Sequence, residues 1–533
     1  MLLLAAAVVI GGGVWFMMRA GGRANRTTRV TSLLPAETLG FLHVPEFNRA
    51  RKEWRETDVY KLWQEPAVQA FLQKPMAGMP ARGSFNAQLQ ELESLRIRDA
   101  FLAITSWQPP NDVKAVGGFR FDGSTEDVKK TVDGWRARLR ENTRKLREET
   151  VEHGKRRIEV ATAGAVKLAT VYHRDWFFAA NDVPQLTALL DRLDGAATAG
   201  TTLSDEANYT RAVAKLPQGY AVAGYARVDE YFARLAAAPP PDVPAQPLQR
   251  LRNIRNVAAA TRFENGKIRD VVFVTMPKTA EAGELTRSSL PLTTAETFLY
   301  ITGMLGIPAE LPADDPSSPS PLGGRLQQII AAIRSSGVTL EQWNRGFGAE
   351  FGIVADWQPG ARIPALFATL PVKDTAVAQE IAAAVTGAGV EGSEWSVSER
   401  EGAVFYSQRP PNPLLALAPT IAIANDRAVA GLDAGSVAAA IKRSAAAGAH
   451  LGAAPAYTAA DSLVPKATNS FVYLDTALLY TRLDAALRPM LIMSAAFMPA
   501  IAQSIDLAKL PEPSVITQHL SPIVLSQSYT GEG

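Results

Sequence analysis

The side chains that could do chemistry in this chain are few and scattered. The chain has no cysteine, which excludes thiol catalysis, iron–sulfur clusters, cysteine-based zinc sites and disulfides. Its five histidines are His43, His153, His173, His450 and His519. No two of them lie three or four positions apart, so no helix face offers a histidine pair to a metal ion. We therefore predict no metal site.

Motifs that activate a nucleophile or cradle a phosphate are also missing from the sequence. There is no G-x-S-x-G elbow and no P-loop, and the run Gly11-Gly12-Gly13 lies inside an apolar N-terminal segment. Asp314 and Asp315 are neighbouring carboxylates, but their Pro/Ser-rich surroundings favour a solvated loop over acid–base catalysis. We predict no catalytic residue and no cofactor. A triad assembled from residues distant in the sequence stays open.

A basic stretch is the strongest candidate for a nucleic-acid site. Its cations are Arg136, Arg138, Arg140, Arg144, Lys145 and Arg147. They are interleaved with acids, which is typical of a solvated helix face: Asp133, Glu141, Glu148 and Glu149. The formal net charge of +2 adds no attraction for a polyanion. We predict no nucleic-acid partner.

The N-terminus carries a segment of membrane-targeting type. Residues 2–18 are uncharged and mostly apolar, and Arg19 and Arg23 follow them. Seventeen residues are the short limit for a spanning helix. No positive stretch precedes the segment, which disfavours a cleaved secretory signal. We expect an uncleaved membrane anchor, with a cleaved signal and a buried core helix as alternatives.

Two arguments give opposite orientations for that anchor in the membrane. The arginines after it would keep the body in the cytoplasm under the positive-inside rule. A lone apolar segment before a large soluble body is instead typical of a signal-anchor. We expect export, with the body in the periplasm or elsewhere outside the cytoplasm.

The body contains an internal repeat, which five pairs of landmarks support in the same order. The offset runs from 259 residues (Ala36 to Ala295) to 244 residues (Ala180 to Ala424). The pairs are Ala36-Glu37-Thr38 with Ala295-Glu296-Thr297, Trp107-Gln108-Pro109 with Trp357-Gln358-Pro359, Ala180-Asn181-Asp182 with Ala424-Asn425-Asp426, Tyr209-Thr210 with Tyr457-Thr458, and Tyr225 and Arg234-Leu235 with Tyr473 and Arg482-Leu483. Collinear matches with drifting offsets indicate a duplication, because loops absorb insertions.

Each repeat is expected to form one sheet with helices packed on it. In the first copy, strands are expected at residues 39–44, 100–105, 113–121, 157–160, 166–172, 176–179 and 220–225. A helix is expected over 125–149 with Thr125 as its N-cap, and Asn181-Asp182 and Asn425-Asp426 should cap later helices. Short turns between strands predict antiparallel pairing. The fold class is α+β: a tandem duplication of a mainly antiparallel sheet unit, behind one N-terminal transmembrane or signal segment.

The expected domain organisation follows the repeat. It is an anchor or signal at 1–18, a linker at 19–32, repeat 1 at 33–236, a Pro-rich linker at 237–250, a hairpin completing repeat 1 at 251–289, repeat 2 at 290–484, and an apolar helix with a truncated hairpin at 485–533. Asn265-Gly266 predicts the turn of the first hairpin. Its second strand has no equivalent after residue 530, so we expect the natural protein to continue for about ten residues.

Two further features have competing interpretations. Trp107 and Trp357 recur at equivalent turns, which favours shared packing over a shared ligand platform. Residues 489–505 carry no charge and include Met490, Met493 and Met498. We expect this run to pack in a core or between domains. Contact with lipid, or with a partner helix, is the alternative.

The opening of the body resembles a bacterial envelope family. Residues 33–38 (Leu-Leu-Pro-Ala-Glu-Thr), followed by Trp54 and the stretch at 60–72, are similar to the start of the family known as domain of unknown function 3352. Its members typically have an N-terminal signal or anchor before that motif. The resemblance implies export and brings no functional residues with it.

These observations lead to one expected function and two alternatives. We expect a membrane-tethered envelope protein with a non-catalytic binding or scaffolding role, attached through residues 2–18 and binding an unidentified protein or apolar ligand. A hydrolase whose site is not visible in the sequence is the first alternative. A carrier of lipid or another apolar molecule is the second.

Overall fold

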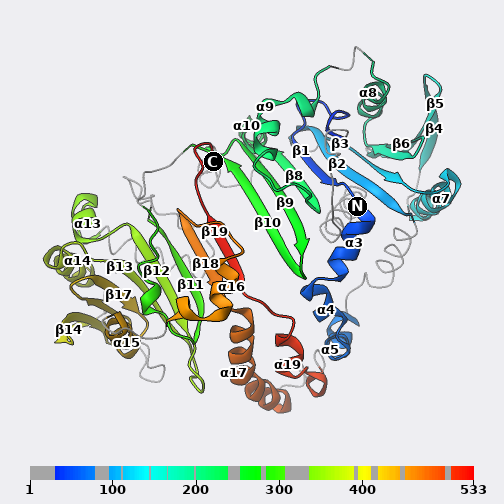
Figure 1. Ribbon diagram of the computed structural model, residues 1–533. Coiled ribbons are helices and arrows are strands. Elements are labelled where there is room, and N and C mark those ends of the chain that lie inside the picture. Colours follow the sequence, from blue (N-terminus) through cyan, green and yellow to red (C-terminus); the bar gives the residue numbers. More distant parts are fainter. Residues whose placement is uncertain are drawn as a thin grey trace. The chain divides into compact units, whose positions relative to one another are not determined.

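A computed structural model describes most of the body of the protein (Figure 1). The described residues are 30–77, 95–109, 112–142, 146–164, 166–196, 200–237, 253–277, 284–305, 335–388, 394–409, 418–444, 450–497 and 506–533. The expected anchor at 2–18 and the Asp314-Asp315 pair lie outside these ranges. Within them, no helix combines the length and the apolar character needed to cross a membrane.

The chain divides into two compact units, which we describe separately. Unit 1 comprises Met1–Pro277 together with Gly531–Gly533, and unit 2 comprises Lys278–Thr530. The backbone N–H of Met276 donates to the carbonyl oxygen of Glu532 at 3.2 Å, so the last residues of the chain contact unit 1. Each unit is α+β and is built on one antiparallel sheet.

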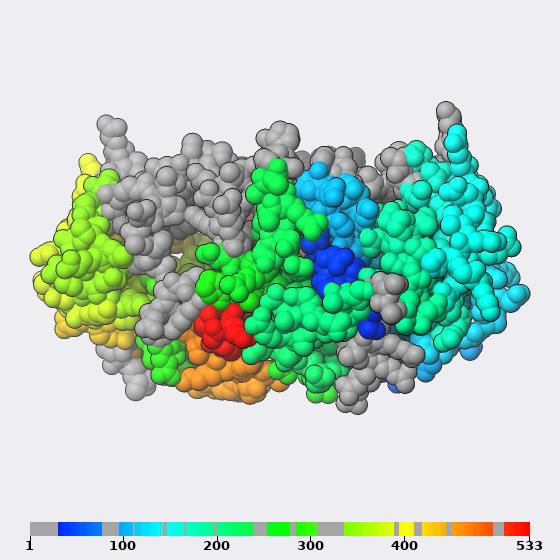
Figure 2. Space-filling model, turned by 90° about the horizontal axis from the view of Figure 1, so that it is seen from above, coloured from blue at the N-terminus to red at the C-terminus, as the bar shows by residue number. Residues whose placement is uncertain are grey.

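Unit 1 is a ten-stranded sheet in the order β10-β9-β8-β1-β2-β3-β7-β6-β5-β4. The strands are β1 (Gly40–Val44), β2 (Ile97–Gln108), β3 (Asp112–Phe121), β4 (Arg147–His153), β5 (Arg156–Ala163), β6 (Val166–His173), β7 (Trp176–Ala180), β8 (Val222–Arg227), β9 (Asn256–Glu264) and β10 (Lys267–Thr275). The described helices are α3 (Phe47–Arg55), α4 (Asp58–Gln64), α5 (Pro66–Ala77), α7 (Thr125–Asn142), α8 (Val183–Leu193), η2 (Leu203–Asp205), α9 (Ala207–Val213) and α10 (Val228–Ala237). In the space-filling view, the cyan residues of α7 and β4–β6 gather at one end of this unit (Figure 2).

Helices cover both faces of the unit 1 sheet. On one face, Phe101 and Phe178 pack against Leu186, Leu189 and Leu190 of α8, whose spacing places them on one side of that helix. On the other face, α3 and α7 bury hydrophobic side chains against β2, β7 and β8. Central strands therefore bury both of their faces, and β7 is almost continuously hydrophobic for this reason.

Unit 2 is a nine-stranded sheet in the order β14-β15-β16-β17-β13-β12-β11-β18-β19. The strands are β11 (Thr297–Met304), β12 (Glu350–Asp356), β13 (Ala365–Pro371), β14 (Trp395–Arg400), β15 (Ala403–Gln408), β16 (Thr420–Ile423), β17 (Arg427–Gly431), β18 (Ser470–Leu474) and β19 (Ile523–Gln527). The described helices are η3 (Leu290–Leu292), α13 (Leu340–Gly346), α14 (Thr375–Gly387), α15 (Ala434–Ser444), η4 (Leu451–Ala453), α16 (Pro455–Asp461), α17 (Thr476–Phe497), η5 (Leu507–Lys509) and α19 (Pro513–Thr517).

The two sheets share one topology, as the duplication requires. Read from its other end, the strand order of unit 2 matches that of unit 1 from β9 to β4. The register agrees as well. In unit 1 Gly40 pairs with Ile104, and in unit 2 the equivalent residue, Leu299, pairs with Ala355. The predicted hairpin of unit 1 is confirmed, and Asn265 and Gly266 both take the positive φ that its turn needs.

The predicted helix at 125–149 ends too late, and its cap is misplaced. Helix α7 ends at Asn142, and Arg147–His153 forms strand β4, which pairs with β5 along its whole length. The Oγ of Ser124, not of Thr125, accepts the backbone N–H of Asp127 at 3.2 Å. The helical spacing of Leu139 and Leu146 extended the prediction by chance into strand β4, whose residues are mostly charged and exposed.

The predicted cap Asn181-Asp182 is right only in that Asp182 is the N-cap residue of α8, where its side chain makes no cap hydrogen bond, and the predicted caps Asn181 and Asn425 are wrong. The amide of Asn181 bonds to the backbone of β3, accepting from Ala115 N–H at 2.8 Å and donating to the carbonyl of Val113. Asn425 lies in the turn between β16 and β17. Helices α8 and α15 begin at Val183 and Ala434, an offset of 251 residues, so the offset of 244 joined two non-equivalent turns.

Two glycines of unit 1 give a paired test of this packing. In β3, a Cβ at Gly118 would lie 2.5 Å from the Phe178 ring and 2.8 Å from the carbonyl oxygen of Phe177, whereas in α7 nothing lies within 4 Å of a Cβ at Gly134. We expect Gly118→Ala to destabilise unit 1 by about 1–3 kcal/mol through overpacking. Gly134→Ala should stabilise it by about 0.5–1 kcal/mol, because alanine favours the helix. Urea unfolding measures both, and equal effects of the two variants would contradict the packing described.

Candidate functional site

The histidine that could serve a catalytic triad, His43, is buried in a structural network. Its Nε2 lies 2.9 Å from the Asp99 carboxylate and its Nδ1 lies 3.3 Å from the Tyr220 hydroxyl, and its side chain is 0% exposed. Burial raises the pKa of Tyr220 far above its usual value, so this hydroxyl is a poor nucleophile at neutral pH. The network has the histidine and the carboxylate of a triad, but its hydroxyl comes from a buried tyrosine.

The other histidines have structural partners as well. His153 lies 2.7 Å from Asp191, and His173 accepts a hydrogen bond from Arg156 at 2.9 Å. Burial, followed by the charge of Arg156, lowers the pKa of His173. The ring of His450 accepts the backbone N–H of Gly452, and His519 is half-buried after α19. Among the described residues, no three histidine, aspartate or glutamate side chains are grouped closely enough to hold a metal ion.

Two arginines of the basic stretch, Arg136 and Arg140, are paired with acids. Arg136 forms ion pairs with Asp133 and Glu159, and Arg140 binds the Glu148 carboxylate at 2.8 Å. Arg147 belongs to β4 and so lies on a different element from the helical residues. The charges of Arg136 and Arg140 are neutralised locally, and Arg147 does not share their helix.

The repeated tryptophans are confirmed as packing residues. Trp107 stacks on Tyr231 with ring centroids 4.6 Å apart, and Trp357 is buried beside Phe298. Equivalent arginines hold the two turns, because Arg234 donates to the carbonyl of Trp107 at 2.8 Å and Arg482 donates to that of Trp357 at 2.9 Å.

A buried carboxylate occupies the same position in both units. By the shared register, Thr302 and Glu350 of unit 2 stand where His43 and Asp99 stand in unit 1. The Thr302 hydroxyl donates to Glu350 at 3.4 Å. Each copy thus keeps an acid on the second strand and a polar partner on the first, although the residue types have changed.

Glu350 fixes the segment before η3. Its two carboxylate oxygens accept the backbone N–H groups of Thr286 at 2.7 Å and Ser288 at 2.6 Å. The hydroxyls of the same two residues add bonds at 2.8 and 3.1 Å. Because Glu350 is only 6% exposed, these bonds compensate for the burial of its charge.

Arg287 lies between those two residues and holds the segment from the other side. Its φ of 59° is unusual for a non-glycine residue. The guanidinium binds Asp461 through two hydrogen bonds of 2.8 and 2.9 Å, donates to the Tyr457 hydroxyl at 2.9 Å, and lies 3.8 Å above the Phe471 ring. Burial lowers the pKa of Arg287, but the hydrogen bonds and charges of Asp461 and Tyr457 together outweigh burial and raise it.

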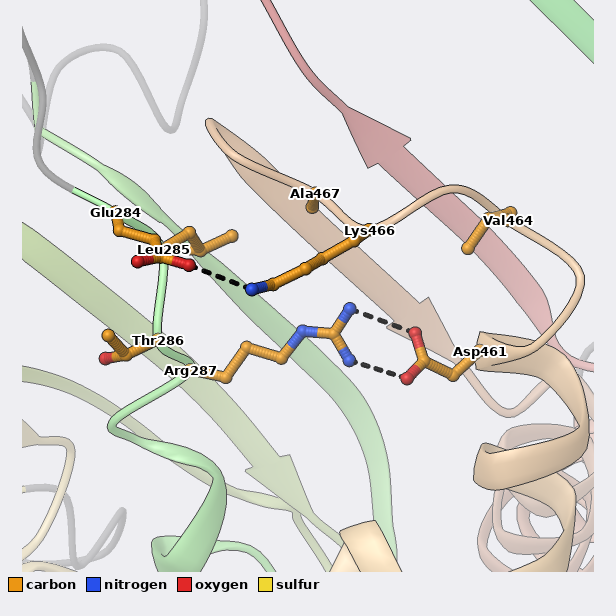
Figure 3. Close-up of a pocket in the computed structure, with 8 residues that line it drawn as sticks. All are labelled: Glu284, Leu285, Thr286, Arg287, Asp461, Val464, Lys466 and Ala467. Carbon is orange, nitrogen blue, oxygen red and sulfur yellow. Dashed lines mark hydrogen bonds and ion pairs between the residues drawn. The ribbon is translucent and has the colours of Figure 1, made fainter.

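A polar crease of about 470 Å³ lies beside this arginine (Figure 3). It is lined by Glu284, Leu285, Thr286, Arg287, Asp461, Val464, Lys466 and Ala467. At its rim the ammonium of Lys466 lies 2.8 Å from Glu284, and this hydrogen bond lowers the pKa of Glu284. Both cations of the crease already have carboxylate partners, so it offers neither an uncompensated charge for an ion nor an acid–base pair set apart for catalysis.

The second half of α17 presents an apolar surface, which we call the α17 apolar patch. The first half packs through Leu478, Leu479 and Leu483 against Phe298 and Trp357. The patch consists of Leu487, Met490, Ile492 and Met493, which are 45%, 57%, 58% and 62% exposed. The expectation that Met490 and Met493 pack in a core is therefore wrong. Met498 lies outside the described residues.

Comparisons with known proteins add little to this description. No family model and no curated protein match the chain. Among solved structures, crystal forms III and I of TP0453 align over 48% of this chain and over 82% and 79% of theirs. Both are 8% identical in sequence, with TM-scores of 0.26 and 0.24.

We expect Glu350→Ala to unfold unit 2 more easily. The substitution leaves the backbone N–H groups of Thr286 and Ser288 without their acceptor, which should cost about 3 kcal/mol or more. Glu284→Ala, at the exposed rim of the same crease, is the matched control and should change stability by less than about 0.5 kcal/mol. Chemical denaturation measures both, and equal losses would show that the Glu350 contacts do not hold the segment.

The stability of unit 2 should depend on pH because of the buried carboxyl group of Asp356. This carboxyl is 2% exposed, accepts a hydrogen bond from Thr297, and lies 3.1 Å from Arg443. Burial raises its pKa despite these partners. The folded state therefore keeps a proton that the unfolded chain releases near pH 4, so stability should fall as pH rises through the folded pKa. Asp356→Asn should remove this slope, and an unchanged slope in the variant would contradict the assignment.

Proposed function

We propose that this chain is a membrane-tethered protein of the bacterial envelope that binds and scaffolds and does not catalyse. The apolar segment at 2–18 and the likeness of residues 33–38 to an envelope family support the tether and the export of the body. The α17 apolar patch is the observation that carries the binding role. In this proposal, the patch rests on the lipid surface to which the chain is tethered.

The exposure of the patch is the first argument for a lipid occupant. Fully burying one leucine, isoleucine or methionine side chain gains about 1.5–3 kcal/mol, so four exposed on one helix end form a favourable contact surface. Leu487, Met490 and Met493 recur every three residues and so follow neighbouring positions along the helix. Clustered exposure of this kind typically marks an interaction site, unlike single scattered apolar residues.

The second argument for a lipid occupant is that the sequence around the patch carries no charge. No charged residue occurs between Pro489 and Ile505, and methionine adapts readily to an irregular apolar environment such as the acyl boundary of a bilayer. The basic Arg488 at the start of this stretch is held by Asp484 at 2.8 Å and by the carbonyl of Pro511. The contact therefore depends on apolar burial and not on attraction to anionic headgroups.

The lack of cysteine allows a direct test in the full chain. Met493→Cys and Leu463→Cys each introduce one thiol for an environment-sensitive fluorophore, and both positions are about equally exposed, at 62% and 60%. In vesicles whose lipids carry a quencher in the acyl chain, we expect strong quenching at position 493 and little at 463. The patch would enter the lipid, whereas Leu463 would stay in water.

Other outcomes identify different occupants. Equal, weak quenching at both positions would contradict lipid contact. If position 493 were shielded without quenching, a protein partner would be favoured, which is the other alternative for this run. A variant that carries Met490→Glu and Met493→Glu should lose the lipid contact and keep its fold, because both side chains are exposed.

A further inference from the structure

The polar crease of unit 2 contains two ion pairs that are held very differently. The inner pair joins Arg287 to Asp461, and its side chains are 17% and 33% exposed. The rim pair joins Lys466 to Glu284, and its side chains are 75% and 72% exposed. Exposed ion pairs contribute little to stability, because water solvates both partners. The rim pair is therefore free to rearrange around a ligand while the inner pair stays in place.

The guanidinium of Arg287 has an unused edge. Of the five N–H groups of an arginine, two bind Asp461 here and a third donates to the Tyr457 hydroxyl. These bonds use both N–H groups of Nη1 and one of Nη2. The Nε–H and the second N–H of Nη2 have no partner in the part of the chain that the structure describes. The two groups point in one direction and form the fork that binds a carboxylate through parallel hydrogen bonds.

The backbone fixes the position of this arginine before any ligand binds. Arg287 has a φ of 59°, and the N–H groups of its two neighbours, Thr286 and Ser288, donate to Glu350. A non-glycine residue keeps such a conformation only where its surroundings determine it, and positions of this kind are common in ligand sites. A cation that is already fixed loses little freedom on binding, which favours affinity.

The duplication shows that the shared fold does not require the charges of the crease. Helices α9 and α16 begin 248 residues apart, as do strands β8 and β18. At this offset, Val213 of unit 1 stands in the place of Asp461, and Gln218 stands in the place of Lys466. Val213 packs against the core of unit 1. The same elements are thus built in unit 1 without this acid and this ammonium.

The order of the charges favours a ligand that carries both signs. Figure 3 shows the side chains of Arg287 and Lys466 running side by side in opposite directions, with Asp461 beyond one and Glu284 beyond the other. A simple ion would add an unpaired charge to this balanced set. A zwitterion would not. With its carboxylate at the two cations and its ammonium at Glu284, neighbouring charges would alternate in sign throughout the crease.

The rest of the lining and the size of the crease limit the ligand further. Leu285, Val464 and Ala467 form an apolar wall, which suits a small apolar side chain. The volume of about 470 Å³ lies within the ~300–1,000 Å³ that is typical of small-molecule sites.

We propose that the polar crease binds a small zwitterion with a free carboxylate, a free ammonium and an apolar side chain, which is the chemistry of an amino acid or a short peptide. The carboxylate accepts from the Nε–H and Nη2–H groups of Arg287 and lies beside Lys466, and the ammonium binds Glu284. This site goes beyond the lipid contact proposed for the α17 apolar patch and does not depend on it.

Calorimetric titration of the full chain with L-alanyl-L-alanine tests the proposal. Amidation of the peptide carboxylate should weaken binding about tenfold or more, because it removes the charge-assisted pair of hydrogen bonds with Arg287. Acetylation of the peptide amine should weaken binding about threefold, as expected for the loss of an exposed charge pair. L-alanine is the second probe. It binds as well as the dipeptide if the site takes single amino acids, and more weakly if the site takes peptides.

Variants of the rim pair locate the ligand in the crease. Glu284→Gln should weaken the binding of the dipeptide about threefold and leave that of the N-acetylated dipeptide unchanged, since the latter has no ammonium. Lys466→Gln should weaken both, because both keep the carboxylate. Glu394→Gln is the matched control and should change neither. Its ion pair with Arg409 lies outside the crease, and the two side chains are 77% and 79% exposed.

Several results would overturn the proposal. Neither the dipeptide nor L-alanine could bind the full chain, capped and free dipeptides could bind equally, or Glu284→Gln could act as Glu394→Gln does. Tighter binding of O-phosphoethanolamine than of both probes would also overturn it, because the ligand would then be a phosphate. The substituted side chains are exposed, and circular dichroism of each variant checks that a loss of binding is not a loss of fold.

Discussion

Burial of the central strands on both faces is the constraint on which the rest of this structure depends. In unit 1, separate clusters of hydrophobic residues lie on the two sides of one sheet, and in unit 2 the same holds for the clusters under α15 and α14. A polar group on such a strand has no water within reach, so it needs a partner inside the protein. For this reason the buried acids and histidines that could do chemistry are held by hydrogen bonds to other protein groups.

The duplicated carboxylate shows how the requirement acts. Asp99 and Glu350 occupy one position in the fold, and each has a polar partner from the neighbouring strand, a histidine in one unit and a threonine in the other. The partner changed while the pairing persisted, as expected when the pairing satisfies a buried charge. In unit 2 the Glu350 carboxylate also accepts hydrogen bonds from the backbone N–H groups of Thr286 and Ser288. These bonds fix the segment that lines the polar crease.

Structural features that depend on local sequence patterns were predicted correctly, whereas features that depend on residues distant in the sequence were not. The α+β class, the duplication and the Asn265-Gly266 hairpin follow from periodicity, repeated landmarks and turn chemistry. The role of Asn181 was missed because its backbone partners are 66 and 68 residues away. The predicted helix after Thr125 was too long because Leu139 and Leu146 fit a helical spacing, although Leu146 directly precedes strand β4. The position of β19 at the edge of its sheet follows from the missing second strand of the repeat, whereas the direction in which α17 faces depends on tertiary packing and was not visible in the sequence.

The surface that we assign to lipid contact lies on the second half of α17, which carries the α17 apolar patch. In the function that we propose, this patch rests on lipid. Hydroxyl-radical footprinting tests it on the unaltered chain, in vesicles and after proteolytic release of the body within residues 19–32. If the patch rests on lipid, Met490 and Met493 are protected from oxidation on the vesicle and oxidise rapidly after release, while the half-buried Met304 changes little. Equal oxidation of Met490 and Met493 in both states would contradict it.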